Sequence, residues 1–228
     1  MTPSAEQQAV AGREEVAASA ARLGARTAYA AAGLNLLAAV AILLVLRPGL
    51  PAPGSLAEER LAFVQGHTGR WWAGWLAWHA AALALLAFYL ALAARWGRRA
   101  PLRCRLAVLC AAAGLAIDLG AQGLTMGLAP RLSVQEFAVL EAAAGLATGY
   151  TGNGLYTTAG ILLTWAGAGE LPRPLLALAG LVWTAGVGLS VTSLVGSAAG
   201  QIASTAALMS SFVLWSFLTG RWLSRRAS

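Results

Sequence analysis

The chain has 228 residues, of which 58% are hydrophobic and 11% are charged, and its mean hydropathy is +0.66. An ordinary soluble domain carries about 25% charged residues, so this composition predicts a membrane protein instead. All 16 basic residues are arginines, which excludes lysine Schiff bases and a Walker-type phosphate site. Two cysteines do not make a disulfide framework, and Cys104 and Cys110 are six residues apart with no CxxC motif, so the pattern does not support a zinc site built from Cys and His alone.

Residues 1–27 are the first predicted unit, a short segment outside the bilayer. They include several charged residues and no continuous apolar core, so we expect the first span, rather than a cleavable signal peptide, to direct insertion. Because this segment is more charged than topology alone requires, Glu14, Glu15 and Arg22 are candidate contacts for a soluble partner. The alternative is a solvated or membrane-surface lead-in to the first span.

Six stretches are long and apolar enough to cross a hydrocarbon layer of about 30 Å as helices. The sequence therefore predicts an all-α integral membrane protein, with a six-helix domain over residues 28–220 and a tail over 221–228. The boundaries of the fourth span are the least defined, because glycines interrupt its apolar run. An interfacial helix is expected before this span. The predicted spans are 28–46, 71–94, 106–129, 145–168, 174–195 and 201–220.

The second span carries His79, eight residues after Trp71 and so about 12 Å below that end of the helix. An intramembrane histidine can serve a proton relay, or it can make a structural hydrogen bond between helices. A haem held by two histidines is not expected, since His67 and His79 do not lie on separate, facing helices.

The third span contains Asp118, the only aspartate of the chain, near its midpoint. A central Asp costs about 2.5 to 3.5 kcal/mol to insert, so we expect it to face protein rather than lipid. Gln122 and Thr125 continue a polar stripe on the same helix face. By the 1.5 Å rise per residue, Asp118 lies about 16 Å below the end of its span, so it could meet His79. The stripe predicts either a proton or ligand site or a buried structural carboxylic acid.

The region of the fourth span combines polar side chains with closely spaced glycines. Tyr150 and Asn153 lie among Gly149, Gly152 and Gly154, which predicts irregular backbone. At membrane depth such backbone is tolerated only where protein or a water-filled cavity covers it. A cavity near Asp118 would account for both features, and a loosely wound entry to the span is the alternative. Asn153 is therefore grouped with Asp118, Gln122 and His79 as a candidate intramembrane polar site.

The arginines predict the orientation, because basic residues collect on the cytoplasmic side. With both termini inside, four arginines face outward and twelve face the cytoplasm. The same asymmetry explains the net charge of +7 without nucleic-acid binding. The twelve are Arg13, Arg22, Arg26, Arg95, Arg98, Arg99, Arg103, Arg105, Arg173, Arg221, Arg225 and Arg226.

Tryptophans cluster near the ends of several spans. Trp71, Trp72 and Trp75 lie at the outer end of the second span, while Trp96 and Trp165 lie near inner ends. Most of these rings are expected at headgroup level. The Gly-xxx-Gly spacings at 123–127, 145–149 and 196–200 predict close helix contacts.

A short cytoplasmic segment followed by six spans, in an arginine-only chain typical of a GC-rich bacterium, resembles the membrane anti-sigma factors of myxobacterial light-induced carotenogenesis. The resemblance covers the layout of the whole chain. It implies a non-enzymatic regulator that holds a sigma factor at the inner membrane until a signal releases it. The HxxxCxxC motif of zinc-type anti-sigma factors is absent, and no site residue is implied.

Three functional classes remain open. The first is a regulatory protein of the bacterial inner membrane that sequesters a soluble cytoplasmic partner, and the second is a small-solute or proton-coupled transporter that uses Asp118. The third is an enzyme acting on lipids or isoprenoids, with Asp118 and Glu141 as acids. No metal or cofactor is predicted, and the expected partners are membrane lipids, the soluble regulatory protein of the first class and a second copy of the chain.

Overall fold

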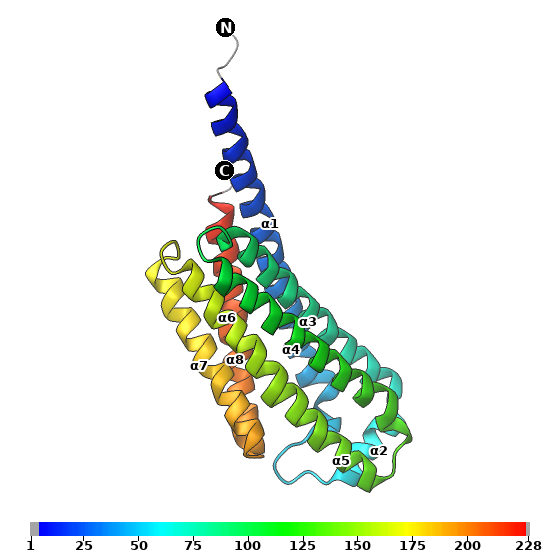
Figure 1. Cartoon of the computed structure of the whole chain (residues 1–228). Helices are drawn as coiled ribbons and strands as arrows, with labels where there is room; N and C mark the ends of the chain where they lie inside the picture. Colours follow the sequence, from blue (N-terminus) through cyan, green and yellow to red (C-terminus); the bar gives the residue numbers. More distant parts are fainter. Residues whose placement is uncertain (1–4, 227–228) are drawn as a thin grey trace.

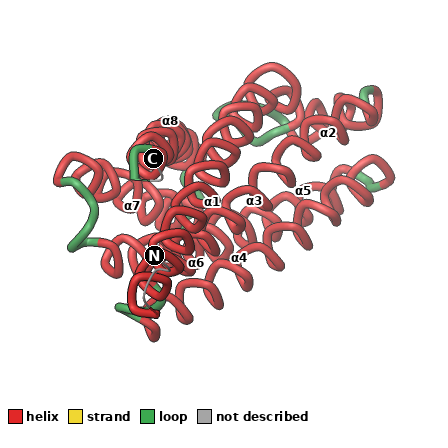
Figure 2. The backbone as a smooth tube through the Cα atoms, turned by 90° about the horizontal axis from the view of Figure 1, so that it is seen from above, coloured by secondary structure: helices red, strands yellow, loops and turns green. Residues whose placement is uncertain are grey.

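The structure is a computed structural model, which describes the backbone of residues 5–226 and the side chains of residues 18–226. Within that range every regular element is helical, as predicted, and the loops are short (Figures 1 and 2). The elements are α1 (Ala5–Ala41), η1 (Ile42–Leu46), η2 (Arg47–Gly49), α2 (Ala57–Gly66), α3 (Thr68–Trp96), α4 (Pro101–Leu128), η3 (Ala129–Arg131), α5 (Val134–Gly145), η4 (Leu146–Gly152), α6 (Asn153–Gly167), α7 (Arg173–Leu194) and α8 (Ala198–Ser224).

Local sequence signals set several helix ends. α5 begins with a capping box, in which the Ser133 hydroxyl accepts a hydrogen bond from the N–H of Glu136 and the Glu136 carboxylate accepts one from the N–H of Ser133. Pro101 lies in the first turn of α4, where its missing N–H would have had no partner within the helix. Between α7 and α8, Gly196 has a φ of 70°, a conformation that favours glycine.

Six helices form a closed ring. In order around it, α1 packs on α3, α3 on α4, α4 on α6, α6 on α7 and α7 on α8, and α8 returns to α1. Helices α2 and α5 pack against each other at one end of the bundle. The interior of this ring is therefore the place where a buried site can form.

Both ends of the described chain lie at the same end of the ring, because α1 begins there and α8 finishes there (Figure 1). We call this the terminal end, and we call the opposite end, which carries α2 and α5, the distal end. α1 has 37 residues and projects beyond the other helices at the terminal end (Figure 1). From residue 5 onward, the expected N-terminal segment is thus continuous with the helix of the first span.

Five helical stretches are long and apolar enough to cross a membrane, and they contain five of the six predicted spans. The fourth predicted span, 145–168, is not among them. It is divided between the π-helical turn η4, with seven residues, and α6, with only 15. The irregular backbone expected there is present, and α5 is the expected helix before it. The five stretches are Ala18–Gly49, Thr68–Trp96, Pro101–Arg131, Arg173–Leu194 and Ala198–Ser224.

The terminal half of the ring is filled by aromatic and aliphatic side chains. Trp96 and Trp215 are fully buried, and Trp215 packs against Phe88 and Trp183 with ring centroids 5.5 and 5.3 Å apart. Trp96 is therefore a core residue and not a headgroup anchor as predicted, whereas Trp165 is exposed as expected.

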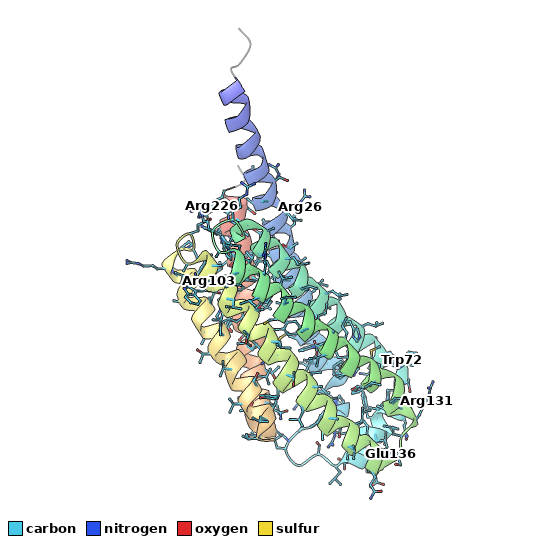
Figure 3. All side chains as sticks on the ribbon, viewed as in Figure 1. Arg26, Trp72, Arg103, Arg131, Glu136 and Arg226 are labelled. Atoms are coloured by element: carbon cyan, nitrogen blue, oxygen red, sulfur yellow. The ribbon has the colours of Figure 1, made fainter. Side chains whose placement is uncertain are left out.

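Ion pairs close the terminal end. Glu170, in the turn between α6 and α7, pairs with Arg95 at 2.7 Å, with Arg226 at 3.6 Å and with Arg99. The guanidinium of Arg103 stacks 3.7 Å from the ring centre of Trp165. The labelled residues Arg26, Arg103 and Arg226 mark this arginine-rich end in Figure 3.

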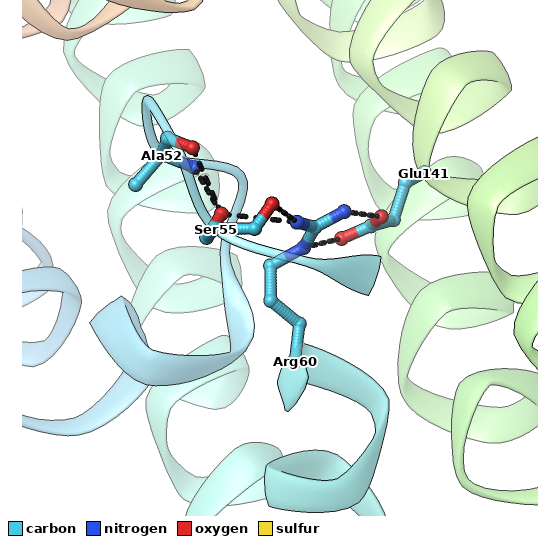
Figure 4. Close-up of polar contacts among 4 residues, drawn as sticks. All are labelled: Ala52, Ser55, Arg60 and Glu141. Carbon is cyan, nitrogen blue, oxygen red and sulfur yellow. Dashed lines mark hydrogen bonds and ion pairs between the residues drawn. The ribbon is translucent and has the colours of Figure 1, made fainter. Parts of the chain in front are cut away.

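The distal end has its own small core and one buried ion pair. Trp71 and Phe137 join Leu46, Val64 and neighbouring apolar residues beneath α2 and α5. Arg60 on α2 binds Glu141 on α5 through two hydrogen bonds of 3.0 and 2.6 Å (Figure 4). The hydrogen bond to Glu141 raises the pKa of Arg60, so the guanidinium stays charged.

Candidate functional site

The distal half of the ring encloses a cavity of about 250 Å³. All six helices of the ring, together with η1 and η4, contribute lining residues. The cavity extends from Leu50 and Gln201, at the distal ends of α1 and α8, to Phe212 and Trp183 where the packed terminal half begins. It lies in the part of the ring that the terminal core does not fill.

Aromatic side chains form much of the wall. Trp75, Trp78 and Tyr89 come from α3, Tyr156 comes from α6, and Trp183 comes from α7. Trp183 is held in place, since its indole N–H donates to Thr164 at 2.9 Å and its ring meets Tyr89 edge-on at 6.5 Å. The wall at this depth is consequently apolar and rigid.

Asp118 on α4 lines the same cavity and is only 5% exposed, which agrees with the prediction that it faces protein. It lies close enough to Gln122 and to His79 to interact with both. Its position beside η4 depends on glycine, because a Cβ on Gly114 would lie 3.0 Å from the carbonyl oxygen of Gly152. The two backbones can approach only where both residues are small.

Gln122 and His79 lie beside the cavity but are not part of its lining. Gln122 is 1% exposed, and neither atom of its amide group reaches a hydrogen-bond partner of good geometry. His79 is half-buried, and its Nδ1 lies 2.9 Å from the carbonyl oxygen of Trp75 on its own helix. Buried polar atoms without partners are costly, so Gln122 is poised to accept or donate a hydrogen bond near Asp118.

Asn153 joins two helices at the cavity wall. Its amide nitrogen donates to the carbonyl oxygen of Gly186 at 2.7 Å and to the hydroxyl of Ser190 at 2.9 Å. Ser190 in turn donates to the carbonyl oxygen of Tyr150 in η4 at 3.4 Å. Asn153 and Ser190 therefore link α6 and η4 to α7, and Asn153 also lines the cavity.

One stripe of α8 closes the last side of the cavity. Residues one or two turns apart face inward along this stripe, which consists of Gln201, Thr205, Leu208, Met209 and Phe212. The residues between them, including Ala206 and Ala207, are exposed. From Ala198 to Ser210 no residue of α8 is buried, whereas the following part of the helix contributes Ser211, Phe212 and Trp215 to the core. The distal half of α8 thus packs loosely over the cavity.

Other sequence-predicted residues lie elsewhere. Glu141 is bound to Arg60 at the distal end and does not line the cavity, so the two acids of the enzyme hypothesis are not brought together. Arg22 is exposed on α1, and the side chains of Glu14 and Glu15 lie outside the described residues. Among the described side chains, no cluster of three or more His, Cys, Asp or Glu residues is placed to hold a metal ion.

The sequence alone offers no reason to select Trp78, Trp183 or Thr205 for this site. Each looks like an ordinary residue of an apolar helix. A weak signal was available on α8, where Gln201 and Thr205 lie one turn apart in a span that is otherwise apolar on that face.

Comparisons with known protein families, with curated proteins and with solved structures find no match to this chain. Its function must therefore be inferred from the geometry of the site itself.

Proposed function

We propose that the chain crosses the bacterial inner membrane six times, with both termini in the cytoplasm. Five crossings would leave the termini on opposite sides, yet both lie at the terminal end (Figure 1). The segment formed by η4 and α6 is the sixth crossing, since it takes its place in the ring between α4 and α7. The excess of arginine at the terminal end supports its cytoplasmic location.

We further propose that the protein is a small-solute transporter whose cavity opens toward the outer face. The observation that carries this proposal is the cavity itself, which reaches an intramembrane carboxylate at Asp118. Ionisable groups inside a membrane bundle are costly to insert and typically bind ions, protons or substrates. In this proposal the packed terminal half closes the cytoplasmic side, and the cavity in the distal half represents an outward-facing state.

Helix α8 is the element best suited to move during transport. Its terminal half is anchored by Trp215 and other core residues, and its distal half has no buried residue. Tilting the distal half toward α1 and α3 would close the cavity without breaking the packed core. Such rocking of one part of a bundle against another is the usual basis of alternating access.

The proposal is tested by filling the cavity. Thr205→Trp places a large ring in the space, and Ala206→Trp places the same ring on the exposed face of α8 as the matched control. The purified variants and the original protein are heated with a panel of small cations, anions and neutral solutes. At 100 times its Kd, a ligand should raise the Tm by roughly 5 to 10 °C.

We expect at least one solute to stabilise the original protein and Ala206→Trp but not Thr205→Trp. If no solute stabilises the protein, or if Thr205→Trp responds equally, the cavity is not a solute site.

A second function is supported by α1, which continues as a helix beyond the bundle at the terminal end (Figure 1). A projecting helix with charged residues is a suitable contact for a soluble regulatory protein, such as a sigma factor. Deleting residues 2–20 should then release the partner from membranes while insertion of the chain stays normal. If the truncated chain recruits the partner as well as the full chain does, this second function is contradicted.

A further inference from the structure

We propose that the cavity binds small organic cations, in particular ammonium ions with an apolar body. The proposal rests on the solute-binding role proposed above and specifies the chemistry of the solute. Three observations lead to it: the charge of the lining, its aromatic content and its apolar remainder.

The charge of the lining favours a positive ligand. Among the described side chains that line the cavity, Asp118 is the only acidic one, and none is an arginine or a histidine. Arg60 is bound by Glu141 at the distal end, and His79 lies beside Asp118 without lining the cavity. A cation that enters the cavity thus meets one carboxylate and no arginine in the lining, whereas an anion would meet a negative group.

The aromatic wall provides the second attraction. A cation over the face of an indole or phenol ring is stabilised by the ring quadrupole, and the effect is largest where water is excluded. Trp75, Trp78, Tyr89, Tyr156, Trp183 and Phe212 supply such rings on several sides of the cavity. Cages of this composition are the characteristic receptors of quaternary ammonium groups.

The apolar remainder of the lining determines the body of the ligand. Leu85, Leu189 and Leu208 lie among the lining residues, and most of the lining surface is apolar. A strongly hydrated divalent metal ion prefers several carboxylate ligands, whereas the described lining offers only that of Asp118. An alkylated or aryl ammonium ion loses little hydration and fills the apolar volume, so it matches the cavity better than an inorganic ion.

The test compares probes of the same shape and different charge. Choline, 3,3-dimethylbutan-1-ol and isethionate share a hydroxyethyl body and differ in carrying a positive, a neutral or a negative head. Benzyltrimethylammonium and phenylmethanesulfonate form a larger pair. Binding to the purified full-length protein is followed by tryptophan fluorescence, because Trp75, Trp78 and Trp183 line the cavity.

We expect each cation to bind at least about tenfold more tightly than its neutral or anionic counterpart, since a desolvated cation–π contact alone has this magnitude. Asp118→Asn, which keeps the size of the side chain, should remove most of this preference. Trp78→Leu should weaken binding of the cations by about tenfold. Trp78→Phe, which retains an aromatic face, should weaken their binding less.

The outcomes separate the two proposals. Neutral or anionic probes that bind as tightly as the cations, with Thr205→Trp blocking them, would disprove the cation class and leave the solute site intact. Cation binding that survives both Asp118→Asn and Trp78→Leu would also disprove it. If none of the five probes binds, the cation proposal fails, while the broader solute panel still decides the proposed function.

Discussion

The terminal and distal halves of the ring use the same helices in different ways. In the terminal half, α8 is packed tightly, with Trp215, Ser216 and Thr219 fully buried. In the distal half, the same helix has no buried residue before Ser211 and only covers a cavity. α8 is thus packed into the core at one end and covers a cavity at the other. This is the arrangement expected of a helix that moves about a fixed point.

The two ends also differ in how charge is held. At the terminal end three arginines share the single carboxylate of Glu170, and one of them, Arg99, has a side chain that is 71% exposed. At the distal end Arg60 and Glu141 form a one-to-one pair that is nine-tenths buried and also fixes Ser55 in the preceding loop (Figure 4). Replacing one partner of an ion pair should therefore lower the free energy of unfolding more at the distal end than at the terminal end.

The largest effect is expected in the terminal core. Trp215→Ala removes a fully buried indole that contacts Phe88, Trp183 and Phe212 and should destabilise the protein by about 3 to 5 kcal/mol. Unfolding in detergent and denaturant, followed by circular dichroism, measures the change. A loss below about 1 kcal/mol would mean that the terminal half is not the rigid half.

Next in size is the distal ion pair. Arg60→Met leaves the buried Glu141 carboxylate without its partner and should cost about 3 kcal/mol of unfolding free energy. The double variant Arg60→Met with Glu141→Leu removes both charges, and we expect it to recover most of this loss. Equal instability of the single and double variants would contradict a paired role.

A smaller effect is expected where α6 meets α7. A Cβ on Gly160 would overlap the ring of Trp183, so Gly160→Ala should cost about 1 to 3 kcal/mol. Gly180→Ala on α7 is the control, because no atom lies within 4 Å of its added Cβ. Relief of glycine's backbone entropy should make this control neutral or slightly stabilising. The same Tm change in both variants would show that the tight contact is absent.

The smallest effect on stability is expected at the cavity. Thr205→Trp should change the unfolding free energy by less than about 1 kcal/mol, since the new ring enters empty space rather than packed atoms. The same change at Thr219, which is fully buried on the same helix, should be several times more costly. Similar losses at both positions would indicate that the distal half is packed after all.

The sequence predicted the features that depend on composition along single helices. Hydropathy located five of the spans, and the cost of a central carboxylate correctly predicted that Asp118 is shielded. The fourth span was less well predicted, because polar residues and glycines interrupt it and only α6 is regular α-helix. Gly-xxx-Gly spacing was a partial guide. Added Cβ atoms on Gly123 and Gly127 would meet nothing within 4 Å, whereas those on Gly149 and Gly200 would overlap Ser193 and Thr192 of α7.

A cavity near Asp118 was among the alternatives that the sequence allowed, but most of its other lining residues could not be predicted. Trp78 and Thr205 lie far apart in the sequence and line one space only because α3 and α8 belong to the same ring. No local pattern encodes this packing of distant helices. By contrast, Asn153 could be selected, since a polar side chain beside irregular backbone at membrane depth indicates a site covered by protein or a cavity, and Asn153 does line the cavity.

The central claim is that the cavity is reached from the outer face and is sealed from the cytoplasm. It is tested most directly with single cysteines at Thr205 and at Ser216, in a chain whose Cys104 and Cys110 are replaced by alanine. A membrane-impermeant thiol reagent is added to either side of sealed vesicles. The account predicts that Cys at 205 reacts from the outer side only and that Cys at 216 reacts from neither side. Reaction at 205 from the cytoplasmic side alone, or protection at 205 from both sides, would contradict it.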